Sequence, residues 1–126
     1  PDLHTLMALS DVVVIAVPAS PQTHHLIDAA ALAAMRPHAH LINIARGDII
    51  DEAALIAALQ ERRIAGAGLD VYEFEPQVPE ALRALDTVTL LQHLGTAALE
   101  VRTQMGLMAV GNAVAFQQGH EVPNAV

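Results

Sequence analysis

Apolar residues along the chain follow two patterns that succeed each other from one end to the other. Continuous runs rich in β-branched residues predict strands, and apolar residues three or four positions apart predict helices. The runs indicate strands at residues 12–17, 40–44, 64–71 and 87–91. The helical spacing indicates helices at residues 1–9, 29–35, 52–62 and 97–118, with a short helical piece that ends near residue 85.

Polar and turn-forming residues separate these elements. Asp28 and Asp51 stand where the second and third helices should begin, and a carboxylate at that position can accept backbone N–H bonds. The run at residues 12–17 contains no polar position, which is typical of a strand covered on both faces. Turns are predicted at residues 46–48 and 92–96.

Strands that alternate with helices predict a parallel sheet with right-handed crossovers. We therefore expect an α/β fold: part of a doubly wound parallel sheet (Rossmann-like), with about four strands, flanking helices and a long C-terminal helix. That strand number corresponds to roughly half of a complete sheet of this class. Ligands of such folds bind beyond the carboxyl ends of the strands.

Composition narrows the class of protein. The 126 residues are 53% hydrophobic, which is enough for the packed core of one domain. A net charge of −8 and an aromatic content of 2% disfavour nucleic acid as a partner, because phosphates would be repelled and few rings could stack on bases. Cysteine is absent, so no disulfide can form. No apolar run is long enough to cross a membrane, and we expect a cytoplasmic protein without a membrane partner.

Chemically capable side chains follow the predicted strands at their carboxyl ends. Arg46 follows the second strand, Asp70 and Glu75 follow the third, and His93 follows the fourth. A guanidinium suits a carboxylate, an imidazole exchanges a proton near neutral pH, and a carboxylate beside that imidazole favours its protonated form. Reduction of a 2-oxo acid requires this set. The alternatives are an exposed ion pair for the arginine, a turn cap for Asp70 and a hydrogen-bonded loop position for the histidine.

Three other patterns have simpler explanations than a binding site. Residues 66–68 carry two glycines inside a predicted strand and open no helix, so they fit close backbone approach better than a dinucleotide loop. The histidines at 24–25 and at 38–40 lack neighbouring cysteines, and we expect no metal site. The acidic stretch at residues 73–80 is expected to be a solvated loop, apart from Glu75.

Segments along most of the chain resemble the NAD(P)-dependent D-2-hydroxyacid dehydrogenase family, in the order in which that family carries them. They are Ser10-Asp11-Val12-Val13-Val14, Leu41-Ile42-Asn43-Ile44-Ala45-Arg46-Gly47 with Asp51-Glu52, Gly66-Ala67-Gly68-Leu69-Asp70-Val71 with Glu75-Pro76, and His93-Leu94-Gly95-Thr96-Ala97 with Arg102, followed by Asn112, Gly119 and Pro123. A series of this length is highly specific.

The resemblance implies a role for each matched residue. It assigns Arg46 to the substrate carboxylate, His93 to the acid/base that protonates the carbonyl oxygen, and Glu75 to the carboxylate paired with that histidine. The positions that match the binding site of the cofactor, NAD or NADP, are Val17, Pro18, Thr23, Ile44, Ala45, Arg46, Asp70, His93, Gly95 and Thr96. The implied substrate is a small 2-oxo or 2-hydroxy acid, and a homodimer is expected for the full-length protein.

The chain also departs from the family pattern. Gln92 stands where proline usually precedes the histidine, and Ala98 stands where a hydroxyl residue is common. The family's substrate domain and the first half of its nucleotide domain, with the glycine-rich loop and the acidic residue for the ribose, have no counterpart. Residues 1–96 thus match the second half of a dinucleotide-binding domain, and residues 97–126 match a helix and tail that return towards the absent substrate domain.

The incomplete match leaves more than one function open. The leading hypothesis is the carboxyl-terminal part of an oxidoreductase that transfers hydride between NAD(P) and a D-2-hydroxy acid, and we expect the isolated chain to be inactive. The alternative is a non-catalytic nucleotide-sensing interaction module, as the family's corepressors illustrate. A stand-alone flavodoxin-like domain would need a phosphate loop that the sequence lacks. Without the missing strands apolar surface should be exposed, so we expect a fragment or a self-associating chain.

Overall fold

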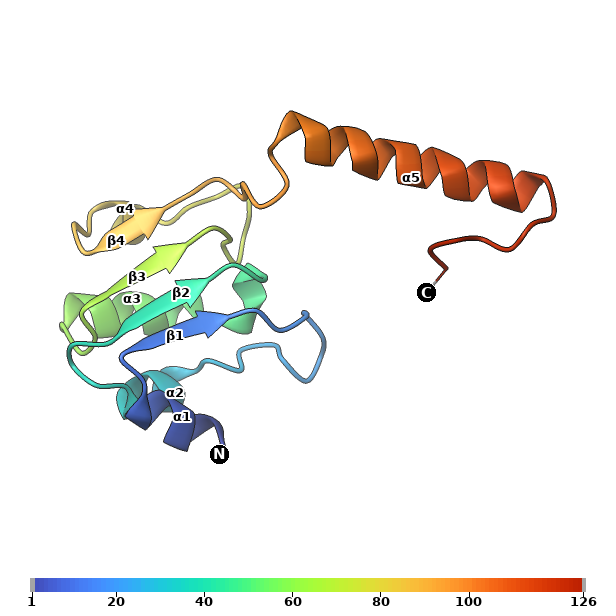
Figure 1. Cartoon of the computed structure of the whole chain (residues 1–126). Helices are drawn as coiled ribbons and strands as arrows, with labels where there is room; N and C mark the ends of the chain where they lie inside the picture. The colour runs from blue at the N-terminus through green and yellow to red at the C-terminus, as the bar shows by residue number, and fades with distance from the viewer. Residues whose placement is uncertain (1, 126) are drawn as a thin grey trace. The chain divides into compact units, whose positions relative to one another are not determined.

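The computed structural model describes residues 2–125, which divide into two compact units between Gln92 and His93 (Figure 1). The first unit contains, in chain order, α1 (Leu3–Leu9), β1 (Val12–Ile15), α2 (Ala29–Ala34), β2 (His40–Asn43), the 3-10 helix η1 (Gly47–Ile49), α3 (Glu52–Gln60), β3 (Gly66–Leu69), α4 (Glu80–Arg83) and β4 (Val88–Leu90). The second unit contains α5 (Leu99–Gln117).

The four strands form one parallel sheet in the order β1-β2-β3-β4. The register pairs Val13 with Leu41, Leu41 with Ala67, and Ala67 with Val88, so these residues form one row across the sheet. The predicted α/β fold with a four-stranded parallel sheet is confirmed. Each strand ends one or two residues earlier than predicted, and the residues that follow belong to the loops at the carboxyl ends of the strands.

Helices α1, α2 and α3 cover one face of the sheet (Figure 1). Every strand is added on the same side of the strand before it, so right-handed crossovers carry α2 and α3 to a common face. The core between these helices and the sheet is aliphatic, and Leu32, Leu41 and Leu55 are almost fully buried in it.

The two predicted helix caps are confirmed. The Asp28 carboxylate accepts the N–H of Ala31 at 2.8 Å, and the Asp51 carboxylate accepts the N–H of Ala54 at 3.0 Å. Each bond satisfies a backbone donor that has no partner within the first helical turn. These caps fix where α2 and α3 begin, and therefore how long the loops after β1 and β2 are.

The expectation that residues 12–17 form a strand covered on both faces is wrong. Val13 and Ile15 point to the helices and are buried, whereas Val12 and Val14 point the other way and are 57% and 54% exposed. Alternate residues of a strand face opposite sides, and the helices of this unit cover only one side. The expectation that apolar surface would be exposed is therefore confirmed.

The glycines of β3 allow the close approach that the sequence predicted. A Cβ added at Gly66 would overlap the backbone oxygen of Thr87, where the chain enters β4. A Cβ added at Gly68 would lie 3.0 Å from the terminal methyl group of Ile42, which is the end of a flexible side chain. Only the first position therefore requires glycine for steric reasons.

The apolar side chains of helix α5 are not covered by other residues of the second unit. It begins at Leu99 rather than at residue 97, and Ala98 at its N-cap offers no side-chain hydrogen bond. None of its residues is buried, and Leu99 and Phe116 are each 78% exposed. No helix in the described part of the chain is both long enough and apolar enough to cross a membrane.

Replacing Gly66 tests the close strand packing. Gly66→Ala should lower the free energy of unfolding by about 1–3 kcal/mol, because the backbone of Thr87 must move to make room for the methyl group. Gly68→Ala is the matched control and should change it by less than about 1 kcal/mol, because the end of Ile42 can turn away. Urea unfolding followed by circular dichroism measures both variants. Equal losses in the two variants would contradict the account.

Candidate functional site

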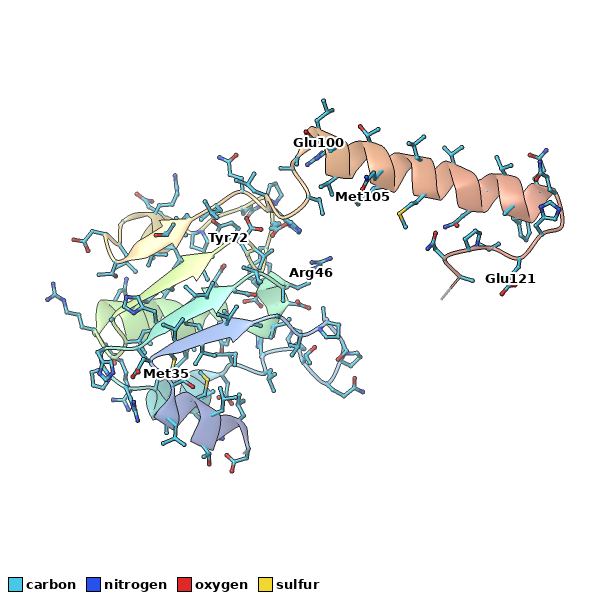
Figure 2. All side chains as sticks on the ribbon, in the orientation of Figure 1. Met35, Arg46, Tyr72, Glu100, Met105 and Glu121 are labelled. Atoms are coloured by element: carbon cyan, nitrogen blue, oxygen red, sulfur yellow. The ribbon has the colours of Figure 1, made fainter. Side chains whose placement is uncertain are left out.

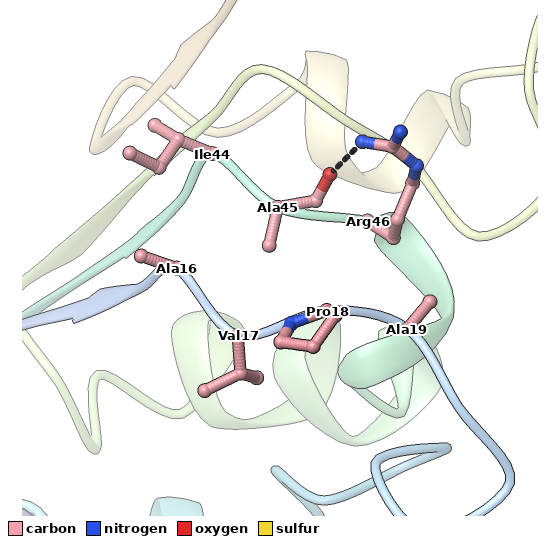
Figure 3. A pocket seen from close by; sticks show the side chains of 7 residues that line it. All are labelled: Ala16, Val17, Pro18, Ala19, Ile44, Ala45 and Arg46. Atoms are coloured by element: carbon pink, nitrogen blue, oxygen red, sulfur yellow. Dashed lines mark hydrogen bonds between the residues drawn. The ribbon is translucent and has the colours of Figure 1, made fainter. Parts of the chain in front are cut away.

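The loops that leave the carboxyl ends of β1 and β2 line an open pocket of about 620 Å³ (Figure 3). Its lining consists of Ala16, Val17, Pro18 and Ala19 from the first loop and Ile44, Ala45 and Arg46 from the second. Five residues predicted to contact the cofactor, at positions 17, 18, 44, 45 and 46, therefore lie together. The pocket falls at the edge of the sheet where ligands of parallel α/β folds bind.

Arg46 lies at this edge and extends away from the sheet (Figure 2). One guanidinium nitrogen, Nη1, donates to the Ala45 carbonyl oxygen at 2.6 Å, as the dashed line in Figure 3 shows. A guanidinium has five N–H donors, so this bond leaves most of them for an anion. Among the described residues Arg46 makes no salt bridge with a carboxylate, which disfavours the exposed ion pair as its explanation.

Asn43 holds the backbone on both sides of Arg46, and sequence reasoning missed it. Its side chain is fully buried; its Nδ2 donates to the Arg46 carbonyl oxygen at 2.8 Å, and its Oδ1 accepts the N–H of Ala45 at 3.0 Å. A buried amide with both groups satisfied fixes the backbone that it binds. The signal available in the sequence was a single polar residue at the end of an apolar strand.

Gly47 brings the loop after β2 against the loop after β3. A Cβ at Gly47 would overlap the backbone of Tyr72 and Glu73, so the two loops touch through their main chains. The Tyr72 hydroxyl donates to the Leu91 carbonyl oxygen at 2.6 Å, and burial is the main cause that raises the pKa of this hydroxyl. The loop after β3 is therefore fixed to both of its neighbours.

Thr23 shapes the pocket loop but does not line the pocket. Its hydroxyl donates to the Pro18 carbonyl oxygen at 2.9 Å and accepts the N–H of Ser20 at 2.8 Å. These bonds close the turn that follows the pocket-lining residues. The cofactor contact expected for this side chain stays a prediction.

Two of the predicted acidic site residues follow β3. Asp70 is buried, and its backbone N–H donates to the Asn43 carbonyl oxygen at 3.0 Å. Glu75 is exposed, and its Oε1 accepts the N–H of Tyr72 at 3.1 Å. Both residues belong to the first unit, as Arg46 does.

The expectation that the loop at residues 73–80 is solvated apart from Glu75 is wrong for Glu73. The Glu73 side chain is only 13% exposed. Its Oε1 is 2.8 Å from His25 Nε2, and its Oε2 accepts the N–H of Glu52 at 3.2 Å. The pKa of the nearby Glu52 carboxyl is raised, mainly by burial. The hydrogen bond from the Glu73 N–H lowers this pKa, and the negative charge of Glu73 raises it.

The remaining predicted site residues belong to the second unit. His93 is exposed and has a left-handed backbone, with φ of 56°. Gly95 and Thr96 are exposed in a turn in which the Ala97 N–H donates to the Leu94 carbonyl oxygen at 2.9 Å. The roles expected for these three residues stay predictions.

Comparison with known proteins identifies the family. Residues 1–95 match the family model described as "D-isomer specific 2-hydroxyacid dehydrogenase, NAD binding domain". The chain belongs to this family. The resemblance inferred from the sequence motifs is therefore confirmed.

Similar proteins include enzymes that act on 2-oxo acids. The chain is 44% identical to the glyoxylate reductase of Pyrococcus furiosus over 124 residues, which cover 98% of this chain and 37% of that protein. The crystal structure of an NADPH-dependent glyoxylate/hydroxypyruvate reductase from Sinorhizobium meliloti, in complex with NADP and malonate, is 40% identical with a TM-score of 0.97. The match covers 100% of this chain and 40% of that one.

A second structural match broadens the range of substrates in the family. The D-mandelate dehydrogenase of Rhodotorula graminis, in its apo form, is 41% identical with a TM-score of 0.90, over 100% of this chain and 37% of that one. The chain thus spans little more than a third of the length of these relatives. In each of these relatives, the segment that matches this chain is one part of a longer protein.

Removing the Asn43 amide tests how Arg46 is held in this dehydrogenase domain. Asn43→Leu keeps the size of the side chain but leaves the Ala45 N–H and the Arg46 carbonyl without their partner. We expect the free energy of unfolding to fall by about 1–3 kcal/mol, the usual effect of an unsatisfied buried group. Urea unfolding measures it, with Thr89→Val on the exposed side of β4 as the control. A change as small as that of the control would refute the role of Asn43.

The raised pKa of Glu52 predicts how stability depends on pH. A carboxyl whose pKa is raised binds its proton more tightly in the folded state, so stability is lost as the pH rises from the ordinary value of 4.5 through the folded-state pKa. The Glu52→Gln side chain cannot ionise. The urea concentration at its unfolding midpoint should therefore increase relative to that of the wild type as the pH rises from about 4 to 7. The matched control is Glu61→Gln, at the exposed end of α3. A gain that is the same at every pH would contradict this prediction.

Proposed function

We propose that this chain forms the nicotinamide-binding and catalytic part of a D-2-hydroxyacid dehydrogenase that reduces a small 2-oxo acid. The observation that carries the proposal is the pocket at the carboxyl ends of β1 and β2, with Arg46 at its edge, in a chain of this family. The glyoxylate and hydroxypyruvate reductases among its relatives support a small acid as substrate.

The residues that line the pocket fit the nicotinamide end of NAD or NADP. Val17, Pro18 and Ile44 offer aliphatic surface to a flat ring, and the loop backbones around them offer polar groups. The volume of about 620 Å³ is in the range of small-molecule sites. When bound, the reduced cofactor would supply the hydride that is added to the carbonyl carbon of the substrate.

Arg46 would bind the carboxylate of the substrate. Its guanidinium can form two parallel hydrogen bonds to a carboxylate, which sets the orientation of the acid as well as its affinity. The buried Asn43 amide and the contact of Gly47 with the Tyr72 backbone hold the chain on either side of it. Such fixed geometry is what a binding group needs in order to orient a reacting carbonyl.

His93 would donate a proton to the carbonyl oxygen of the substrate as hydride reaches the carbon. Imidazole is suited to this role because it gains and loses a proton near neutral pH. Glu75 would pair with it and favour its protonated form, and Asp70 would lie near the cofactor's carboxamide. These assignments rest on the match to the family's motifs.

The remaining expectations extend the proposal to the whole protein. Residues 1–96 would complete a dinucleotide-binding domain, and residues 97–126 would return towards a substrate domain. The exposed apolar residues of β1 and α5 are consistent with homodimer formation or with a covering domain. Cytoplasmic localisation stays a prediction from the sequence.

A chimaera tests the proposed activity. This chain would replace the matching segment of the Pyrococcus furiosus glyoxylate reductase, with which it is 44% identical. We expect the chimaera to oxidise NADH or NADPH when glyoxylate or hydroxypyruvate is added, measured by absorbance. His93→Ala should abolish turnover but spare cofactor binding. Arg46→Gln should lower kcat/KM for the acid by about 10- to 100-fold, as expected for a lost bond to a charged group.

Arg83→Gln, at the end of α4, is the control for Arg46 and should leave kcat/KM unchanged. Wild-type rates in either site variant would refute the assigned role. A folded chimaera that binds NADH but reduces no 2-oxo acid would instead favour the non-catalytic nucleotide-sensing module.

A further inference from the structure

Two imidazoles and a carboxylate gather at a place that the proposed reaction does not use. His24 and His25 belong to the loop after β1, and Glu73 belongs to the loop after β3. One ligand atom from each of them lies within 4.8 Å of the other two. We call these three residues the His-His-Glu cluster.

The backbone at His25 explains why two consecutive imidazoles lie together. Side chains of neighbouring residues point to opposite sides of an extended chain. His25 instead adopts a left-handed conformation, with φ of 49°, and its N–H donates to the Asp48 carbonyl oxygen at 2.8 Å. The rings of His24 and His25 consequently stack with their centroids 4.0 Å apart.

Glu73 is already oriented by its neighbours. Its Oε2 accepts the N–H of Glu52, while its Oε1 faces His25 Nε2 at 2.8 Å. An outer hydrogen bond of this kind fixes the direction in which a metal-binding carboxylate presents its other oxygen. Unlike the many exposed acidic groups that bind no ion, this carboxylate is mostly buried.

We propose that the His-His-Glu cluster binds a divalent transition-metal ion of the Zn²⁺ type. Two imidazoles and one carboxylate are a common ligand set for zinc, with water in the fourth position. The hard ions Ca²⁺ and Mg²⁺ prefer oxygen ligands alone and are disfavoured. This proposal does not depend on the proposed dehydrogenase activity.

Small movements bring the ligands to the distances that the ion needs. Tetrahedral ligand atoms about 2.1 Å from zinc are separated by roughly 3.4 Å from one another. The pair of His25 and Glu73 must open slightly from 2.8 Å to admit the ion in place of their hydrogen bond. His24 is exposed, so its ring can rotate out of the stack and turn a nitrogen towards the ion.

The fold supplies the ligand that the sequence pattern lacked. The expectation of no metal site rested on the absence of neighbouring cysteines, whereas the third ligand is Glu73, which is 48 positions from His25. A bound ion would join the loop after β1, which lines the pocket, to the loop that carries Glu75. Both loops would then be more rigid than the hydrogen bond alone makes them.

Calorimetric titration of the 126-residue chain, prepared without a histidine tag, with ZnCl₂ tests the proposal. We expect one ion per chain, and with Co²⁺ a visible absorption band typical of tetrahedral nitrogen and oxygen ligands. His24→Ala and Glu73→Gln should each weaken Zn²⁺ binding at least about tenfold, since even outer-shell partners contribute that much. Circular dichroism checks that both variants keep the fold.

The chain offers a matched control pair. His38 Nε2 lies 2.8 Å from Asp11 Oδ1, so this is a second histidine–carboxylate pair, but it is exposed and belongs to no three-ligand group among the described residues. His38→Ala and Asp11→Asn should leave Zn²⁺ affinity unchanged. The proposal is overturned if the wild-type chain binds no ion stoichiometrically, or if His24→Ala binds as tightly as the wild type. Equal weakening in the control pair also overturns it, because binding would then be spread over surface histidines.

Discussion

The handedness of the crossovers between parallel strands is the constraint on which the first unit depends. Each strand is added on the same side of the last, so α2 and α3 must pack on one face. That face buries Val13 and Leu41 in an aliphatic core, while Val12 and Val14 on the other face stay exposed. Because the four strands are parallel, the loops after β1, β2 and β3 leave the sheet at a single edge. The candidate site and the exposed apolar face therefore both follow from a parallel sheet with right-handed crossovers.

The edge is built mainly by backbone contacts and buried polar groups. Asn43 binds the main chain on both sides of Arg46, and Gly47 lets that loop touch the backbone of Tyr72. The Glu73 carboxylate joins the start of α3 to His25 in the loop after β1. Loops of this kind usually move more than the elements that they connect, and these bonds restrain them.

Local features could be predicted from the sequence, and features that depend on distant partners could not. Asp28 and Asp51 were recognised as caps because their partners are three residues away. Exposed apolar surface was expected, but its position at Val12 was not, because the apolar run does not show which layer covers the second face. Glu73 was missed because its partners are 21 and 48 positions away. The arginine at position 46 was found from its place after a strand, but the amide that holds it was not, since one asparagine in an apolar run has several explanations.

The central claim is that the pocket between the first two strand ends receives the nicotinamide end of the cofactor. Two-dimensional amide NMR of the ¹⁵N-labelled chain, titrated with NADH and with NADPH, tests it most directly. We expect concentration-dependent shifts at the amides of residues 16, 17, 19 and 44–47, which surround the pocket, and at other residues assigned to the cofactor, such as Asp70. Shifts at the opposite end of the strands, near residues 38–40, or no shift anywhere at millimolar cofactor, would contradict it.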